Sequence, residues 1–121
     1  MDAFPGPRSP AGSITIEHEE SDRRVLCLRG EVDTAVATRF TSLQGRERVA
    51  VDAIDAGAVT FICSSGLALM LRSVEASRAA GRQIMLRAAS RQVDRALQLA
   101  GIDGVFPRPE PTKAQPPAGD G

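Results

Sequence analysis

Apolar and polar residues alternate over residues 14–18, which is typical of a half-buried β-strand. The next apolar stretch, residues 25–28, is continuous and indicates a strand in the interior of a sheet. Only a short segment with the turn signal Ser21-Asp22 separates the two. Strands joined by so short a turn are antiparallel neighbours, so the chain is predicted to open with a β-hairpin.

A helical spacing of apolar residues follows this hairpin. Val36, Phe40 and Leu43 fall at i, i+4 and i+7, so a helix is predicted over residues 34–44. Asp33 and Thr34 are both candidates for its N-cap, because short polar side chains there can accept from free backbone N–H groups.

The rest of the chain alternates strand and helix patterns. The predicted elements are a strand at 49–54, a β-favouring segment at 59–62, a helix from about 64 to Gly81, a strand at 83–87, a helix from the cap Ser90 to Gly101, and a short strand at 105–106. The predicted order is therefore β-β-α-β-α-β-α-β. This order predicts an α/β fold with right-handed crossovers and a mixed, mostly parallel sheet of four to five strands.

Proline positions mark the ends of the domain. All eight prolines lie outside residues 11–106, and proline is excluded from the interiors of helices and strands. The folded domain is thus predicted to span residues 13–106. Residues 1–12 are predicted to be a disordered arm, and residues 107–121 a Pro-rich disordered tail.

Composition excludes several classes of function. Fifteen basic and fifteen acidic residues give zero net charge, so direct nucleic-acid binding is not expected. No apolar run is long enough to span a membrane, and the first residues do not resemble a secretory signal, so a cytoplasmic protein is expected. His18, Cys27 and Cys63 are the only His and Cys residues, too few for an ordinary zinc site. No nucleophile has a recognisable general base, so we expect neither an enzyme nor a cofactor.

Three segments resemble the STAS family, the sulfate-transporter and anti-sigma-factor-antagonist domains. Residues 30–33, Gly-Glu-Val-Asp, are similar to the family's G-E-[LIV]-D. Residues 59–67, ending in Cys-Ser-Ser-Gly-Leu, are similar to its F-[ILM]-D-S-[ST]-G-L region. Residues 93–106 are similar to its pattern of an amphipathic helix, a Gly and a short apolar strand.

The resemblance implies a single-domain bacterial anti-sigma factor antagonist that acts in transcription regulation and stress response by partner switching. Such a protein binds an anti-sigma factor that is also a Ser/Thr kinase of the histidine-kinase-like ATPase type, and so releases a sigma factor. The kinase phosphorylates the antagonist and a phosphatase restores it. By position, Ser64 is the phosphoacceptor. The implied partner-binding residues are Glu31, Asp33, Cys63, Ser64, Ser65, Gly66 and Leu67.

The sequence departs from the family pattern in three places. Cys63 stands where the family has Asp, the first helix is short, and the Pro-rich tail replaces the usual last helix. Cys63 has two interpretations: a small substitute for Asp, or a reactive thiol under redox control, with Cys27 as a second cysteine. A catalytic Cys63 is disfavoured, because the phosphatase pattern C-x₅-R would need Arg where Leu69 stands.

Other motif residues have a structural reading beside the functional one. Either Ser64 or Ser65 is expected to cap the following helix whether or not Ser64 is modified. Asp33 is a cap, a partner contact or both. Gly66 allows another backbone to approach closely, or relieves crowding in the turn. The arginines of the second half form a solvated face or meet an acidic partner: Arg72, Arg78, Arg82, Arg87, Arg91 and Arg95.

Two further functions remain open. One is a STAS subunit of a phospholipid-transport ABC complex, which shares the fold and the S-[SA]-G-L region. The other is a degenerate STAS regulator that is not phosphorylated and is controlled by redox chemistry at Cys63.

Overall fold

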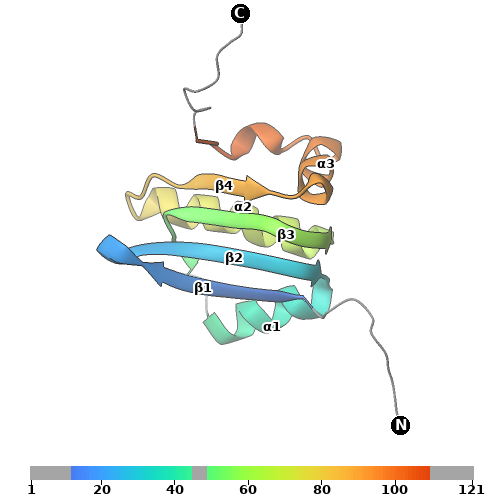
Figure 1. Ribbon diagram of the computed structural model, residues 1–121, viewed down its shortest axis with the longest axis horizontal. Coiled ribbons are helices and arrows are strands. Elements are labelled where there is room, and N and C mark those ends of the chain that lie inside the picture. Colours follow the sequence, from blue (N-terminus) through green and yellow to red (C-terminus); the bar gives the residue numbers. More distant parts are fainter. Residues whose placement is uncertain (1–11, 45–48, 110–121) are drawn as a thin grey trace, which may run out of the picture.

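A sheet of four strands in the order β1-β2-β3-β4 lies at the centre of the structure, a computed structural model that describes residues 12–44 and 49–109 (Figure 1). The elements are β1 (Ser13–Glu19), β2 (Arg23–Val32), α1 (Thr34–Gln44), β3 (Ala53–Ile62), α2 (Ser64–Ala79), β4 (Met85–Ala89) and α3 (Arg91–Leu99), with single 3-10 turns at Glu20–Asp22 and Asp103–Val105.

The strand directions confirm the predicted mixed sheet. β1 and β2 are antiparallel, in a register that runs from Ser13 opposite Arg29 to Glu19 opposite Arg23. β2 pairs with β3, and β3 with β4, in parallel. The hairpin turn lies at the predicted place, where Ser21 and Asp22 both have positive φ angles, 65° and 64°. The carboxyl ends of β2, β3 and β4 therefore meet at one edge of the sheet.

The predicted strand at 49–54 and the segment at 59–62 are corrected to one continuous strand, β3. The chain just before it, which the sequence analysis assigned to a strand, is held by α2 instead. Val51 N–H donates to Ser77 Oγ over 2.8 Å, and Ser73 Oγ donates to the Val49 carbonyl over 2.6 Å. Buried serines thus satisfy the Val49 carbonyl and the Val51 N–H, and backbone bonds to β2 and β4 begin only at Asp52.

The predicted last strand at 105–106 is absent from the described residues. A 3-10 turn occupies Asp103–Val105, and Phe106 is buried in the core. The chain then meets β4 through one backbone bond, from Leu86 N–H to the Pro107 carbonyl at 2.7 Å. Pro107 has no N–H, so the ladder of a fifth strand cannot continue through it.

All three helices pack on one face of the sheet. Leu26 and Leu28 of β2 point into the main core with Phe40 of α1, Met70 of α2 and Leu97 of α3. Because side chains alternate along a strand, the neighbouring β2 residues face the opposite side. There Val25 and Cys27 form a small separate cluster with Ala53 of β3.

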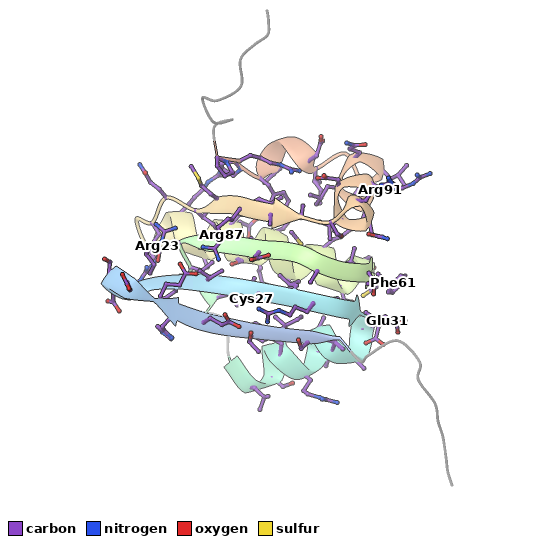
Figure 2. All side chains as sticks on the ribbon, in the orientation of Figure 1. Arg23, Cys27, Glu31, Phe61, Arg87 and Arg91 are labelled. Carbon is purple, nitrogen blue, oxygen red and sulfur yellow. The ribbon has the colours of Figure 1, made fainter. Side chains whose placement is uncertain are left out.

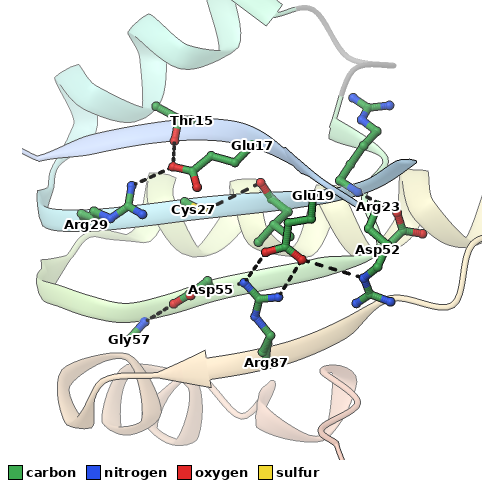
Figure 3. Close-up of polar contacts among 12 residues, drawn as sticks. Thr15, Glu17, Glu19, Arg23, Cys27, Arg29, Asp52, Asp55, Gly57 and Arg87 are labelled. Atoms are coloured by element: carbon green, nitrogen blue, oxygen red, sulfur yellow. Dashed lines mark hydrogen bonds and ion pairs between the residues drawn. The ribbon is translucent and has the colours of Figure 1, made fainter. Parts of the chain in front are cut away.

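Charged side chains cover this second face, where no described helix packs (Figure 3). Arg87 of β4 donates two hydrogen bonds to the Glu19 carboxylate, at 3.1 and 3.2 Å, and lies 3.7 Å from Asp55. A second pair, Arg29 with Glu17 at 3.3 Å, lies beside it. The hydrogen bonds from Arg87 lower the pKa of Glu19. We call this the open face of the sheet.

The predicted disordered arm and tail lie outside the described residues, except for Gly12 and residues 107–109. At the start of the predicted tail, Arg108 pairs with Asp94 of α3 over 2.6 Å, in addition to the Pro107 bond to β4. None of the described helices is long and apolar enough to cross a membrane.

Candidate functional site

The two motifs that carry the family resemblance lie side by side at the carboxyl edge of the sheet. β2 and β3 end together, with Val32 opposite Ile62 in the parallel register. A backbone hydrogen bond of 3.0 Å from Cys63 N–H to the Val32 carbonyl then joins the two segments beyond the strands. The start of α1 and the start of α2 are thereby held next to each other.

The predicted site residues differ in accessibility. Three are exposed: Glu31, Asp33 and Ser64. Cys63, Ser65 and Leu67 are half-buried, and Leu67 packs against the main core. Gly66 is buried, so it shapes this edge and offers no side chain to a partner.

Asp33 caps α1 as the sequence predicted. Its Oδ1 accepts from Val36 N–H at 3.0 Å, and its carbonyl accepts from Ala37 N–H, the first α-helical bond. A carboxylate at a helix N-terminus also compensates the helix dipole. The cap fixes Asp33 while leaving the side chain exposed at the edge.

The prediction that Ser64 or Ser65 caps α2 is wrong. Ser64 is already the first helical residue, and Cys63 holds the cap position with an extended backbone, φ −94° and ψ 176°. The side chain of a first-turn residue projects outward from the helix end, so Ser64 Oγ is not needed for capping. Ser64 is therefore an exposed hydroxyl beside the positive end of a helix.

The Cys63 thiol lies among hydrogen-bond donors. Burial alone would raise its pKa, but the nearby backbone N–H groups of Gly66 and Ser65 and the hydroxyls of Thr34 and Ser65 favour the thiolate and outweigh this. The pKa of Cys63 therefore lies below the ordinary thiol value of 9.0. Thr34 Oγ1 is 3.7 Å from Cys63 Sγ. Such surroundings favour the thiolate, which is the reactive form of cysteine.

Gly66 is required by packing. A Cβ atom at this position would lie 2.7 Å from Ile62 Cγ1 and 2.9 Å from Val32 Cγ1. Of the two expectations for Gly66, relief of crowding is the one that fits, since the close neighbours are side chains and not another backbone. The missing side chain lets α2 begin directly against the ends of both strands.

Cys27 lies away from this edge. Burial raises the pKa of its thiol, whose Sγ donates to the Val25 carbonyl at 3.9 Å. Cys27 is opposite Asp55 in the sheet register, and Cys63 comes eight residues later (63 − 55). At about 3.3 Å per residue this separates the two cysteines by roughly 25 Å, far beyond the reach of a disulfide. Both cysteines are free.

Two residues lie beside the site although the sequence did not indicate them as site residues. Thr34 was considered only as a cap, although its hydroxyl contacts Cys63. Phe61 was treated as a strand residue, but it lies opposite Glu31 in the register and its side chain is 50% exposed. Figure 2 shows Phe61 and Glu31 together at the end of the sheet. The parallel pairing of 30–33 with 59–62 would have been the signal for both.

The described surface contains two hollows of interest. The larger, about 460 Å³, lies between β1 and α1 and is lined by none of the predicted site residues. The smaller, about 260 Å³, lies between α1 and α2 and includes Ser65. No cluster of three or more His, Cys, Asp or Glu side chains that could hold a metal ion occurs within residues 12–44 and 49–109.

Comparison with known proteins gives one family and several solved structures. A family model described as "Mlab, STAS domain" matches residues 16–107. No curated protein matches the chain.

The structure is similar to that of the anti-sigma factor antagonist SpoIIAA in its unphosphorylated form, with a TM-score of 0.63, 20% identity, and coverage of 84% of this chain and 92% of that one. It is also similar to an anti-sigma factor antagonist from Mycobacterium paratuberculosis, with a TM-score of 0.61 and 23% identity. That comparison covers 86% of this chain and 89% of the other. The Bacillus cell fate determinant SpoIIAA in its phosphorylated form is similar with a TM-score of 0.58 and 20% identity. That comparison covers 84% of this chain and 96% of the other.

Proposed function

The chain belongs to the STAS domain family, and from this premise we propose that it is a bacterial anti-sigma factor antagonist. It binds an anti-sigma factor of the histidine-kinase-like ATPase type and thereby frees a sigma factor. It acts in the cytoplasm as a binding protein and not as an enzyme.

The observation that carries the proposal is the position of Ser64. Its hydroxyl is exposed, at the first residue of α2, on the same edge as Glu31 and Asp33. The fold is shared with antagonists solved in unphosphorylated and phosphorylated forms, which supports the idea that this fold accommodates phosphate.

Phosphorylation of Ser64 would act on the partner surface and not on the fold. A phosphate adds about −1.5 to −2 charges and three acceptor oxygens. The N-terminus of a helix stabilises such an anion. Glu31 and Asp33 already make the edge acidic, so a partner adapted to the unmodified edge would meet added bulk and repulsion. The kinase would thus switch off its own antagonist, and a phosphatase would restore it.

The test is an affinity capture from native lysate with four baits: wild type, Ser64→Ala, Ser64→Glu and Ser64→Gln. Gln has the size of Glu without its charge, so it separates charge from bulk. Capture of a histidine-kinase-like ATPase by wild type and Ser64→Ala, with at least about tenfold less by Ser64→Glu, is the expected result. Equal capture by all four baits would retain the partner and eliminate the phosphoswitch.

A second candidate is the STAS subunit of a phospholipid-transport ABC complex. The matching family model carries the name Mlab, and this favours it. The same capture discriminates, since this candidate requires an ABC-type ATPase in place of the kinase.

A third candidate is a STAS regulator that is not phosphorylated and responds to redox conditions through Cys63. The half-buried Cys63 thiol, whose pKa is lowered, supports it. Cys27 is buried and its pKa is raised, which supports assigning any such role to Cys63 alone.

A further inference from the structure

A groove between α1 and α2 begins beside the first turn of α2, next to Ser64, and runs toward the other end of that helix. Its volume is about 260 Å³. The residues that line it recur at helical spacing, Thr38, Thr41 and Ser42 on α1 and Ser65, Ala68 and Arg72 on α2. From Ser65 to Arg72 the helix rises about 10 Å, so the groove follows both helices for about two turns.

Apart from Arg72, the side chains that line the groove are short, and most of them carry a hydroxyl group. Alanines and short hydroxyl side chains allow the backbone of a third element to approach closely, while bulky side chains would keep it away. Thr41 Oγ1 donates to the Ala37 carbonyl of its own helix at 2.9 Å, which leaves its lone pairs as acceptors. Thr38 and Ser42 are exposed and can both donate and accept.

The groove is lined by one basic side chain and by no acidic one. Arg72 is exposed at its far end and has no ion-pair partner among the residues the structure describes. By contrast, Arg29, Arg82, Arg87 and Arg108 all pair with carboxylates. α1 contains no acidic residue, and the one acidic residue of α2, Glu75, follows Arg72 by three positions without forming an ion pair with it. A carboxylate supplied from outside would find Arg72 available for a bidentate bond.

We propose that this groove binds an acidic helical segment of the protein partner, with a carboxylate of that segment paired to Arg72. A helix is the occupant that two parallel rows of small side chains fit, since ridges of a third helix can enter the groove between them. The partner itself is the one assigned under the proposed function, and the inference rests on it. Arg72 is about 12 Å along α2 from Ser64, so the contact extends the interface well beyond the phosphoacceptor.

Charge reversal tests the pairing. Arg72→Glu is expected to weaken partner binding by roughly tenfold or more, because it places like charges in contact. Arg95→Glu is the matched control: it makes the same change at an exposed arginine of α3, which does not line the groove. Thermal unfolding of both variants shows that each is folded. Equal affinities of the two variants would overturn the proposal.

The position of the partner segment is tested by a photo-crosslinking amino acid at Thr38, with Gln92 of α3 as the control position. In native lysate, the Thr38 crosslink is expected to fall on an acidic helical peptide that the Gln92 position does not capture. Replacing the crosslinked Asp or Glu of the partner by Arg should restore binding to Arg72→Glu.

The outcomes separate the two proposals. Capture of a kinase-type ATPase without any crosslink at Thr38 would overturn the groove and leave the antagonist function standing. A Thr38 crosslink to an acidic helix of an ABC-type ATPase, with Arg72 dependence, would support the groove and overturn the antagonist function. Absence of any partner in both experiments would overturn both.

Discussion

Gly66 and Val32 approach so closely that a Cβ atom on Gly66 would lie 2.9 Å from Val32 Cγ1. The two residues come from segments more than thirty positions apart, and their contact holds the start of α2 against the end of β2. The geometry of the edge that presents Ser64 depends on this absence of a side chain.

Gly66→Ala is therefore expected to destabilise the protein. In an open helix the same change would stabilise by up to about 1 kcal/mol, because glycine is a poor helix former. Here the methyl group overpacks Ile62 and Val32, at a cost of about 1–3 kcal/mol. For a domain of this size a net loss of 1 kcal/mol lowers Tm by roughly 4–8 °C, which thermal unfolding measures.

Gly104→Ala is the control, because an added Cβ there meets no atom within 4 Å. Its Tm should be unchanged or slightly raised. A Gly66→Ala protein that unfolds at or above the wild-type temperature would contradict the packing argument.

Cys63 and Cys27 are expected to differ in reactivity toward a disulfide reagent such as DTNB. One thiol per native chain should react quickly, and both should react after unfolding, because Cys27 is buried with a raised pKa. Cys63→Ser should abolish the fast phase. Thr34→Val should slow it near neutral pH, since loss of the hydroxyl donor raises the Cys63 pKa and lowers the thiolate fraction. A fast phase that survives Cys63→Ser would disprove this assignment.

A charged side chain at position 64 is expected to change the unfolding free energy in a direction set by the sign of its charge. Ser64→Glu should stabilise the fold or leave it unchanged, within about 1 kcal/mol, because a negative charge at the first turn of α2 compensates the helix dipole. Ser64→Lys should destabilise it by a similar amount. Denaturant unfolding at low ionic strength measures both. A Ser64→Glu protein that loses several kcal/mol would mean that phosphate unfolds the domain and does not merely block its surface.

Asp52 is expected to contribute to stability above about pH 4 and to lose that contribution in acid. Its carboxylate accepts from Arg24 N–H and from Arg82, both at 2.9 Å. Partial burial opposes ionisation, yet these bonds hold the pKa of Asp52 below its ordinary value of 3.8. A lowered pKa stabilises the folded state above the unfolded-state pKa, and the gain disappears as pH falls through the folded-state value.

Asp52→Asn should therefore cost about 1–3 kcal/mol at pH 7, and its unfolding free energy should fall less than that of wild type between pH 6 and pH 2.5. Asp103→Asn removes the same charge at an exposed position and should follow the wild-type profile. Parallel profiles for Asp52→Asn and wild type would exclude this role.

Local patterns predicted the parts of the fold that depend on near neighbours. The hairpin turn at Ser21-Asp22, the Asp33 cap and the Ser90 cap, whose Oγ accepts from Val93 N–H at 3.2 Å, all lie where the sequence placed them. Each requires only a few consecutive residues. The same is true of the helix end at Gly101, whose φ of 72° suits glycine.

Tertiary contacts determined the features that the sequence did not predict. Residues 49–51 have the pattern of a strand, but two serines of α2 bond the Val49 carbonyl and the Val51 N–H. The exposure of Phe61 depends on a register shift beside Gly30, where φ is 71°. The place of Cys63 at the N-cap position depends on the residue at which α2 begins, which sequence patterns fix only to within a few positions. The α1–α2 groove joins residues whose proximity only the packed helices reveal.

The bond between Leu86 N–H and the Pro107 carbonyl makes the two borders of the sheet unequal. Pairing between strands of different copies requires an edge strand whose outer backbone groups are unpaired. In the part of the chain that the structure describes, the N–H of Leu86 on the β4 border already donates to the segment after Phe106, while β1 at the other border pairs with β2 alone. A strand added from outside would therefore meet a partly occupied border at β4 and an unoccupied one at β1, so β1 is the border where strand addition is expected.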